Sequence, residues 1–244
     1  MNTNKNSYTI LYAAGLVVIV AFLLAAASSA LKPAQDKNVE IDKKKQILAA
    51  LNVRNLTDAQ DIEKKYDEFV VADLVVDSAG NVVKKGEGKD KDGFRVSGKE
   101  VTPANLPLYL CKVDGKTKLV LPMTGRGLWG GLWGYLAIDD DCQTVFGAYF
   151  SHESETAGLG ALIAEEKFQS QFKGKHLFAN PQDSEVALTV VKNGKTDPAQ
   201  KDCQVDGVTG ATLTSVGVGN MVKNGTQAYA GCLKAFKEKE LNCK

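Results

Sequence analysis

A ten-residue stretch near the end of the chain concentrates side chains that can do chemistry. It holds four hydroxyl side chains and two glycines in the order Asp206-Gly207-Val208-Thr209-Gly210-Ala211-Thr212-Leu213-Thr214-Ser215. Glycine lets a backbone turn sharply and approach a ligand closely. The residues that follow are helical in pattern, and a helix start presents free N–H groups and the positive end of its dipole. The stretch therefore predicts a phosphate-binding turn; the alternative is a polar turn with Thr214 or Ser215 as helix N-cap.

A second segment, Gly125-Arg126-Gly127-Leu128-Trp129-Gly130, satisfies the GxGxxG pattern. In a dinucleotide site this pattern follows a strand and opens a helix. Residues 131–136 are instead glycine-rich and strand-like, so we predict no NADH site in this chain. A tryptophan in such a loop stacks well on a flat aromatic ligand, which would place Gly127, Leu128 and Trp129 beside a ring system. The alternative is a tight β-turn with core tryptophans.

A third segment, His152-Glu153-Ser154-Glu155-Thr156-Ala157-Gly158-Leu159-Gly160, brings one histidine and two carboxylates together. With no second histidine nearby this is a poor transition-metal site, and we predict no metal centre. Thr156 can hydrogen-bond a ligand or cap a helix that begins near Leu159, and the two roles are compatible.

The first segment resembles the flavinylation motif of the FMN-binding domain family, Asp-x-x-Ser/Thr-Gly-Ala-Thr. The matching residues are Asp206, Thr209, Gly210, Ala211 and Thr212. In that family a flavin transferase joins FMN to the last threonine through a phosphodiester bond. The resemblance therefore implies covalent FMN on Thr212, with Thr214 and Ser215 near the phosphate.

The other two segments are similar to the flavin pocket of the same family. The Gly127-Leu128-Trp129 loop resembles that of the C-subunit branch of the sodium-translocating NADH:quinone reductases. The third segment resembles the motif His-x-x-Glu-Thr-Pro-Gly-Leu-Gly, with Ala157 in the proline position. This resemblance assigns to the flavin pocket Glu155, Thr156, Gly158, Leu159 and Gly160. Lys173 and Lys175 also match a family position, and are equally ordinary surface charges.

The resemblance implies an electron relay rather than substrate turnover, so we expect no catalytic residue here. The cofactor supplies the redox chemistry, and the protein supplies position and electrostatics. The implied partners are the other subunits of the membrane redox complex, which oxidise NADH, reduce ubiquinone and translocate sodium, and the flavin transferase during maturation. The G subunit of the Rnf complex is a near alternative. A noncovalent flavin oxidoreductase and an anchored structural subunit without flavin are alternatives outside the family.

One apolar run lies near the N-terminus. Residues 8–31 contain no charge, and an apolar run longer than about 18 residues predicts a transmembrane helix. We expect Pro33 to end it. A signal peptide is the alternative, because Ser28-Ser29-Ala30 is similar to a cleavage site. The prediction is a single-pass protein of a bacterial inner membrane.

The two indications of topology disagree. Lysines after the span favour a cytoplasmic domain under the positive-inside rule, but long domains are translocated largely regardless of charge. The family resemblance favours the periplasmic side, where the flavin transferase works, and we follow it. The predicted parts are a tail (1–7), the transmembrane helix (8–31) and a soluble domain (32–244) with its FMN-binding part at about 108–240.

Composition excludes other classes. The 244 residues carry a net charge of +1, without the basic footprint of a nucleic-acid-binding protein. None of the five cysteines lies in a CxxC pair, so a zinc or iron–sulfur site is not predicted. One or two disulfides remain open, and their pairing cannot be read from sequence. The cysteines are Cys111, Cys142, Cys203, Cys232 and Cys243.

The elements that position these segments follow from hydrophobic periodicity and turn residues. Helical spacing predicts helices over 36–51, 57–69 and 159–172, and a long final helix from Leu213. Strand patterns predict hairpins over 70–84 and 108–122 and strands at 133–138, 144–151 and 186–191, with 86–93 as a loop. This mixed order favours an α+β fold: one N-terminal transmembrane helix followed by one mixed α/β FMN-binding domain.

Overall fold

The computed structural model describes residues 6–85 and 90–242. Its α-helices are α1 (Asn6–Ala50), α2 (Ala59–Phe69), α3 (Glu166–Gln169) and α4 (Thr212–Asn242). Its strands are β1 (Val70–Val76), β2 (Val82–Lys85), β3 (Leu106–Val113), β4 (Lys116–Arg126), β5 (Gly131–Ile138), β6 (Val145–His152), β7 (Thr189–Val191) and β8 (Gln204–Asp206). Four short 3-10 helices are η1 (Gly93–Arg95), η2 (Gly160–Ala164), η3 (Ser170–Phe172) and η4 (Lys201–Cys203).

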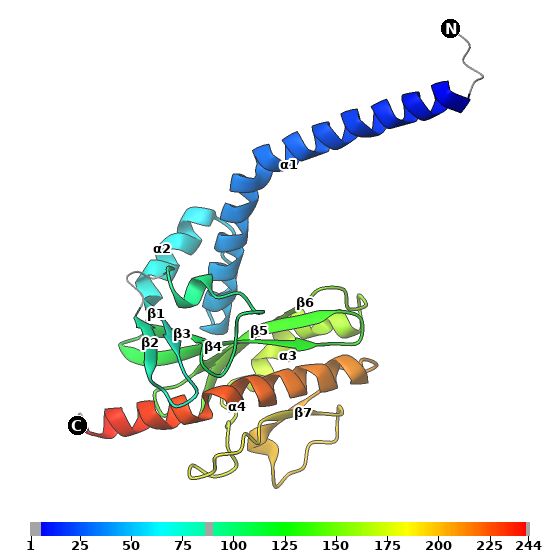
Figure 1. The fold of residues 1–244 in the computed structure, drawn as a ribbon. Helices are drawn as coiled ribbons and strands as arrows, with labels where there is room; N and C mark the ends of the chain where they lie inside the picture. The colour runs from blue at the N-terminus through cyan, green and yellow to red at the C-terminus, as the bar shows by residue number, and fades with distance from the viewer. Residues whose placement is uncertain (1–5, 86–89, 243–244) are drawn as a thin grey trace. The chain divides into compact units, whose positions relative to one another are not determined.

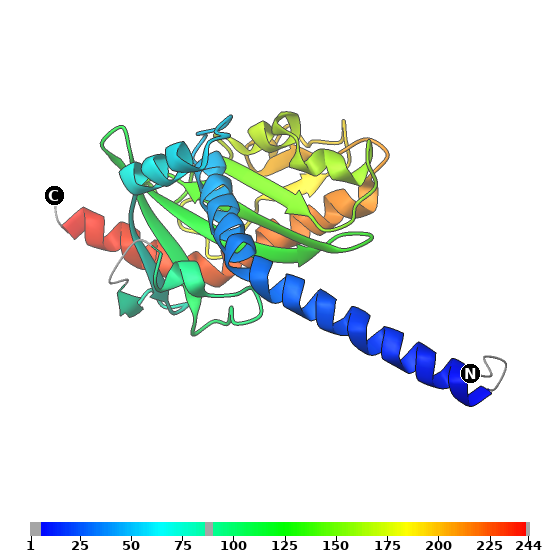
Figure 2. The ribbon, with the colours of Figure 1, turned by 90° about the horizontal axis from the view of Figure 1, so that it is seen from above.

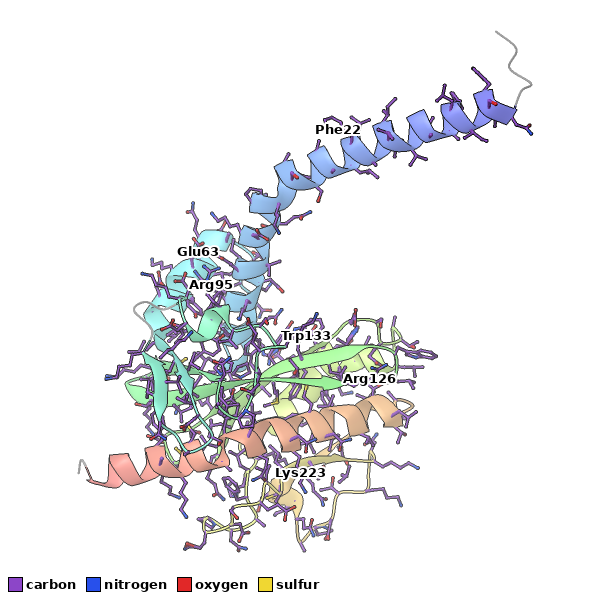
Figure 3. All side chains as sticks on the ribbon, viewed as in Figure 1. Phe22, Glu63, Arg95, Arg126, Trp133 and Lys223 are labelled. Carbon is purple, nitrogen blue, oxygen red and sulfur yellow. The ribbon has the colours of Figure 1, made fainter. Side chains whose placement is uncertain are left out.

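The chain divides into two compact units, residues 1–43 and residues 44–244. The described part of the first unit belongs to α1, which is long and apolar enough to cross a membrane, with a mean hydropathy of 2.7 in its most apolar window. Its apolar side chains are exposed, and Phe22 is one of those labelled in Figure 3. A helix that is apolar on all sides suits a lipid environment. The predicted span 8–31 lies wholly within α1.

The expectation that Pro33 ends this helix is wrong. Pro33 lies inside α1, and the helix predicted over 36–51 is the continuation of the same element. A proline removes one backbone hydrogen bond and crowds the preceding turn, at a cost of about 3 kcal/mol. The turns on both sides of Pro33 keep their own hydrogen bonds, so α1 continues through it.

A six-stranded antiparallel sheet, in the order β2-β1-β3-β4-β5-β6, forms the centre of the second unit. Both predicted hairpins are confirmed, as β1–β2 and β3–β4. Asp114 and Gly115 have positive φ angles of 50° and 77°, as a two-residue hairpin turn requires. The strands predicted at 133–138 and 144–151 are β5 and β6.

Helices lie on both faces of this sheet (Figures 1 and 2). α4 lies along one face and contacts β4 and β5, and a buried apolar core fills the space between them. On the other face lie α2, whose N-cap is Asp58, and the last turn of α1. There the indole of Trp133, a residue labelled in Figure 3, donates from Nε1 to Gln46 Oε1 at 3.1 Å. The central strands are therefore packed on both sides.

A two-stranded parallel sheet of β7 and β8 packs against α4 (Figure 1). The strand predicted over 186–191 is shorter than expected, and β8 was not predicted. The helix predicted over 159–172 is also wrong as one element, because it is divided into η2, α3 and η3. Glu165, between η2 and α3, has an extended backbone with φ −83° and ψ 145°. Residues 86–89 of the predicted loop lie outside the described residues.

The four described cysteines are buried. Burial raises the pKa of the Cys111 thiol and of the Cys203 thiol, which lowers the reactivity of both. Cys243 lies outside the described residues.

Glycines in α4 let the helix approach the sheet closely. A Cβ at Gly217 would lie 2.5 Å from the Arg126 carbonyl oxygen. We predict that Gly217→Ala lowers the free energy of unfolding by about 1–3 kcal/mol, although alanine is otherwise the better helix former. Asn224→Ala, at an exposed position of the same helix, should change it by less than about 0.5 kcal/mol. Thermal unfolding measured by circular dichroism tests this, and an unchanged Tm for Gly217→Ala would contradict the close approach.

Candidate functional site

The three candidate segments converge at the first turn of α4. Gly210 adopts a left-handed conformation with φ 80°, and α4 begins directly afterwards, at Thr212. The expectation that Thr214 or Ser215 caps the helix is wrong, because both lie inside its first turn and are buried. The helix starts earlier because the left-handed glycine turns the chain before Ala211, leaving Thr212 exposed as the first helical residue.

Glu155 joins the three segments. Its Oε1 accepts a hydrogen bond from the Trp129 backbone N–H at 2.9 Å, and its Oε2 accepts one from the Thr214 hydroxyl at 2.6 Å. Gly127 and Gly160 lie so close to this carboxylate that neither position has room for a Cβ. The glycines at these positions are therefore needed for close packing around Glu155, and both carboxylate oxygens are occupied within the protein.

The buried Glu155 carboxyl is held in its ionised form. Burial alone raises its pKa, but the hydrogen bonds from the Thr214 hydroxyl and from backbone N–H groups of the 128–130 loop outweigh it, and the net pKa is lowered. A carboxylate that accepts several hydrogen bonds is stabilised as the anion. Glu155 consequently acts as a charged anchor between the β4–β5 loop and α4.

The motif before α4 is held by its own polar side chains. Ser215 Oγ accepts from the Val208 backbone N–H at 2.9 Å. Asp206 Oδ1 accepts from the Gly194 N–H at 3.0 Å and from the Thr196 hydroxyl at 2.9 Å. These bonds fix the motif to its own helix and to the connection between β7 and β8, so that the exposed Thr212 is presented from a well-supported turn.

Exposed apolar side chains from all three segments lie near this turn. Trp129 is 65% exposed and Leu213 is 62% exposed, and a group of exposed large apolar side chains is more informative than a single one. The alternative of a turn with core tryptophans is thus wrong for Trp129, whereas Trp133 is half-buried. The apolar patch consists of Leu128, Trp129, Leu159, Leu213 and Val216.

The remaining predicted site residues lie in the loop between β6 and η2, and they do not all make the expected contacts. The Thr156 carbonyl accepts from the N–H groups of Leu159 and Ala161, both at 3.1 Å, and η2 has no side-chain cap, so the expected capping by the Thr156 side chain is not observed. His152 Nδ1 accepts from the Glu155 N–H at 3.1 Å. Gly158 has a φ of 73° and is exposed.

The two candidate lysines beyond η3 do not approach this turn through any described bond. Lys175 donates to the Lys201 carbonyl at 2.6 Å, so it ties together two backbone segments. Lys173 is exposed. Both therefore fit the interpretation as ordinary surface charges.

The residues present fit a flavin nucleotide. A cavity of about 140 Å³ beside Thr212 is lined by Thr209, Gly210 and Ser215, and such hydroxyl and backbone groups suit a phosphate. The exposed apolar patch, which includes an indole, suits a flat aromatic ring. Arg126, which is labelled in Figure 3, is the last residue of β4. Its carbonyl oxygen packs closely against Gly217 of α4, so the β4–β5 loop lies beside the start of α4.

One part of the site, the connection between β7 and β8, was not predicted from the sequence. Lys192 and Asn193 line the cavity beside Thr212, and Asn193 Nδ2 donates to Thr209 Oγ1. The only sequence signal was the Asn193-Gly194 pair, which is typical of turns. It predicts a turn without indicating what the turn contacts.

Comparison with known proteins places the chain in a family. Residues 127–227 match the FMN-binding domain family. The C subunit of the Na(+)-translocating NADH-quinone reductase of Haemophilus ducreyi is 37% identical, with 97% of this chain and 96% of that protein covered. The protein of the same name from Pseudomonas aeruginosa is 30% identical, with coverage of 96% and 98%.

A solved structure agrees. The crystal structure of the C subunit of the Na(+)-translocating NADH-quinone reductase from Parabacteroides distasonis has a TM-score of 0.74 to this chain at 38% identity, covering 83% of this chain and 96% of the other. The expected family and the expected fold are both confirmed by these matches. This chain, with its FMN-binding domain, belongs to the family of the C subunits of the Na⁺-translocating NADH-quinone reductases.

Proposed function

We propose that this chain is an electron-relay subunit of a Na⁺-translocating NADH-quinone reductase and carries FMN bound covalently to Thr212. The observation that carries the proposal is the exposed Thr212, presented on a left-handed turn at the start of α4 beside an exposed apolar patch. Names and near full-length similarity of the relatives support the membership of a redox complex. Bound FMN would supply one-electron and two-electron transfer.

Two separate groups of residues in this chain would bind the phosphate and the ring of FMN. The cavity beside Thr212 and the first N–H groups of α4 would hold the phosphate, since the helix dipole favours an anion there. The apolar patch would cover one face of the ring and exclude water from it. Glu155 would hold the β4–β5 loop, and with it Trp129, at a fixed distance from α4.

A flavin transferase would load the site. The Thr212 hydroxyl would attack the flavin-side phosphorus of FAD, forming a Thr212 Oγ1–P bond and breaking the pyrophosphate bond. AMP would leave, and the hydroxyl proton would pass to a base of the transferase. Exposure of Thr212 at the surface is compatible with access by such an enzyme. The attachment through phosphate leaves the flavin ring chemically unchanged.

The relay role is tested in the assembled complex. A complex that contains the Thr212→Val variant should still oxidise NADH with an artificial one-electron acceptor, because its partner subunits are intact. It should lose NADH-dependent quinone reduction. Unimpaired quinone reduction, with assembly of the complex verified, would refute the relay role while leaving FMN binding as a separate question.

The chain is a single-pass inner-membrane protein in this proposal, with residues 44–244 on the periplasmic side. We predict that protease added to intact spheroplasts digests this domain, whereas inverted membrane vesicles protect it. Immunoblotting for the domain provides the measurement, with a known cytoplasmic protein as the control for spheroplast integrity. Protection in spheroplasts and digestion in inverted vesicles would instead place the domain in the cytoplasm, as the lysines after the span favour.

A further inference from the structure

Two hollows adjoin the loop that carries Thr209. They share lining residues from the motif and from the β7–β8 connection, namely Asn193, Gly207, Val208 and Thr209. The first hollow, of about 140 Å³, includes Thr212 and Ser215. The second, of about 550 Å³, does not include Thr212 and extends toward η2 and α3. The size of the hollows alone would favour the second as a ligand site.

The charged residues that line the two hollows favour the first hollow instead. Among the residues that line the first, the one ionisable side chain is the cation Lys192. The second is lined by two carboxylates, Glu165 and Asp206, and by one cation, Lys167. A phosphodiester carries one negative charge, so it is attracted by a nearby cation and repelled by a nearby carboxylate. The smaller hollow therefore suits the anion, and the larger one disfavours it.

The β7–β8 connection is fixed in place by three hydrogen bonds of the residues that follow Lys192. Asn193 Nδ2 donates to Thr209 Oγ1, within the wall shared by the two hollows. Asp206 Oδ1 accepts from Gly194 and Thr196, farther along the same connection. These three bonds hold the backbone that carries Lys192 against the flavinylation motif, on the side of Thr212.

We propose that Lys192 is the counter-ion of the phosphodiester on Thr212, and that the Asn193–Thr209 hydrogen bond is the positioning contact that keeps Lys192 there. The inference rests on the proposed function, because it needs FMN on Thr212. It assigns to the β7–β8 connection a role in phosphate binding that none of the three sequence motifs indicates. Asp206 then acts through this connection rather than by touching the cofactor.

The test is ³¹P nuclear magnetic resonance of the full-length, FMN-loaded chain in detergent. We expect Lys192→Met to shift the phosphodiester signal toward that of a free phosphodiester in water. In the wild type, salt at about 1 M, where the Debye length is about 3 Å, should shift the signal in the same direction. Asn193→Ala should give a shift of the same sign, because it releases the connection. Lys195→Met is the matched control, since Lys195 is exposed on the same connection and lines neither hollow.

The possible results separate the inference from the function on which it rests. A Lys192→Met signal that coincides with the wild-type signal, or a Lys195→Met shift of equal size, would overturn the role of Lys192 and leave covalent FMN intact. A wild-type chain without any FMN on Thr212 would overturn the proposed function itself. Loss of loading in Lys192→Met alone, with an unchanged Tm, would support the pairing, because the phosphoryl group must enter the same hollow during transfer.

Discussion

Replacing Thr212 with valine is expected to abolish covalent FMN and to leave the fold intact. Valine has nearly the shape of threonine but lacks the hydroxyl that would form the bond to phosphorus. Thr212 is exposed, and a substitution at an exposed position away from packing changes stability by less than about 0.5 kcal/mol. Flavin fluorescence of the denatured chain in a gel, after co-expression with a flavin transferase, should fall to background.

The matched controls for this result are two other hydroxyl variants. Thr212→Ser keeps a hydroxyl at the same position and should retain part of the fluorescence. Thr214→Val should also retain covalent flavin, although it removes the buried hydrogen bond to Glu155 and should lower Tm. Full fluorescence in Thr212→Val would refute the assignment of Thr212, and its complete loss in Thr214→Val would make Thr214 the candidate.

Removing the Glu155 side chain is expected to give a large loss of stability. Glu155→Ala leaves the buried Thr214 hydroxyl without its acceptor and opens a space between the β4–β5 loop and α4. The cost of such an unsatisfied buried group and lost hydrogen bonds to a charged partner is about 2–4 kcal/mol. We expect a Tm decrease of about 4–16 °C in thermal unfolding of the full chain.

Glu153→Ala is the control for that measurement, because Glu153 is an exposed neighbour whose carboxylate accepts a 3.1 Å hydrogen bond from the Gly131 N–H. It should change the free energy of unfolding by less than about 0.5 kcal/mol. Equal Tm values for Glu155→Ala and the wild type would show that the three segments are not held by this carboxylate.

The contribution of Glu155 should also depend on pH. Its pKa is lower in the folded chain than in the unfolded chain, so its ionisation stabilises the fold above the unfolded pKa. That contribution is lost as pH falls through the folded pKa. The difference in Tm between wild type and Glu155→Gln should therefore be largest near neutral pH and should decrease in acid. A difference that grows in acid would contradict the lowered pKa.

The sequence predicts those elements whose structure depends only on residues that are neighbours in the chain. The Asp114-Gly115 turn is an example, because positive φ angles at two adjacent residues determine the hairpin between β3 and β4. Pro33 is an opposite example: its local penalty predicts an end, but the turns on both sides continue α1. The three-residue β8 escaped prediction because it is too short for alternation and pairs in parallel with β7, across a separate connection.

The three segments of the candidate site could be predicted from the sequence, but the contacts between them could not. Glu155 and Thr214 are 59 residues apart, and the bond between them follows from tertiary packing. The same holds for the bond from Asn193 to Thr209, because Asn193 lies in none of the three segments. Hydroxyls expected near a phosphate, those of Thr214 and Ser215, are partly engaged within the protein, and their contact with the cofactor stays a prediction.

Mass analysis of the tryptic peptide 202–223 tests the central proposal most directly. This peptide contains Thr209, Thr212, Thr214 and Ser215, so fragmentation must locate the modification within it. After co-expression with a flavin transferase, the account predicts an FMN-sized adduct on Thr212. An unmodified peptide, from a preparation in which the transferase loads a known substrate, or an adduct on any other residue, would contradict it.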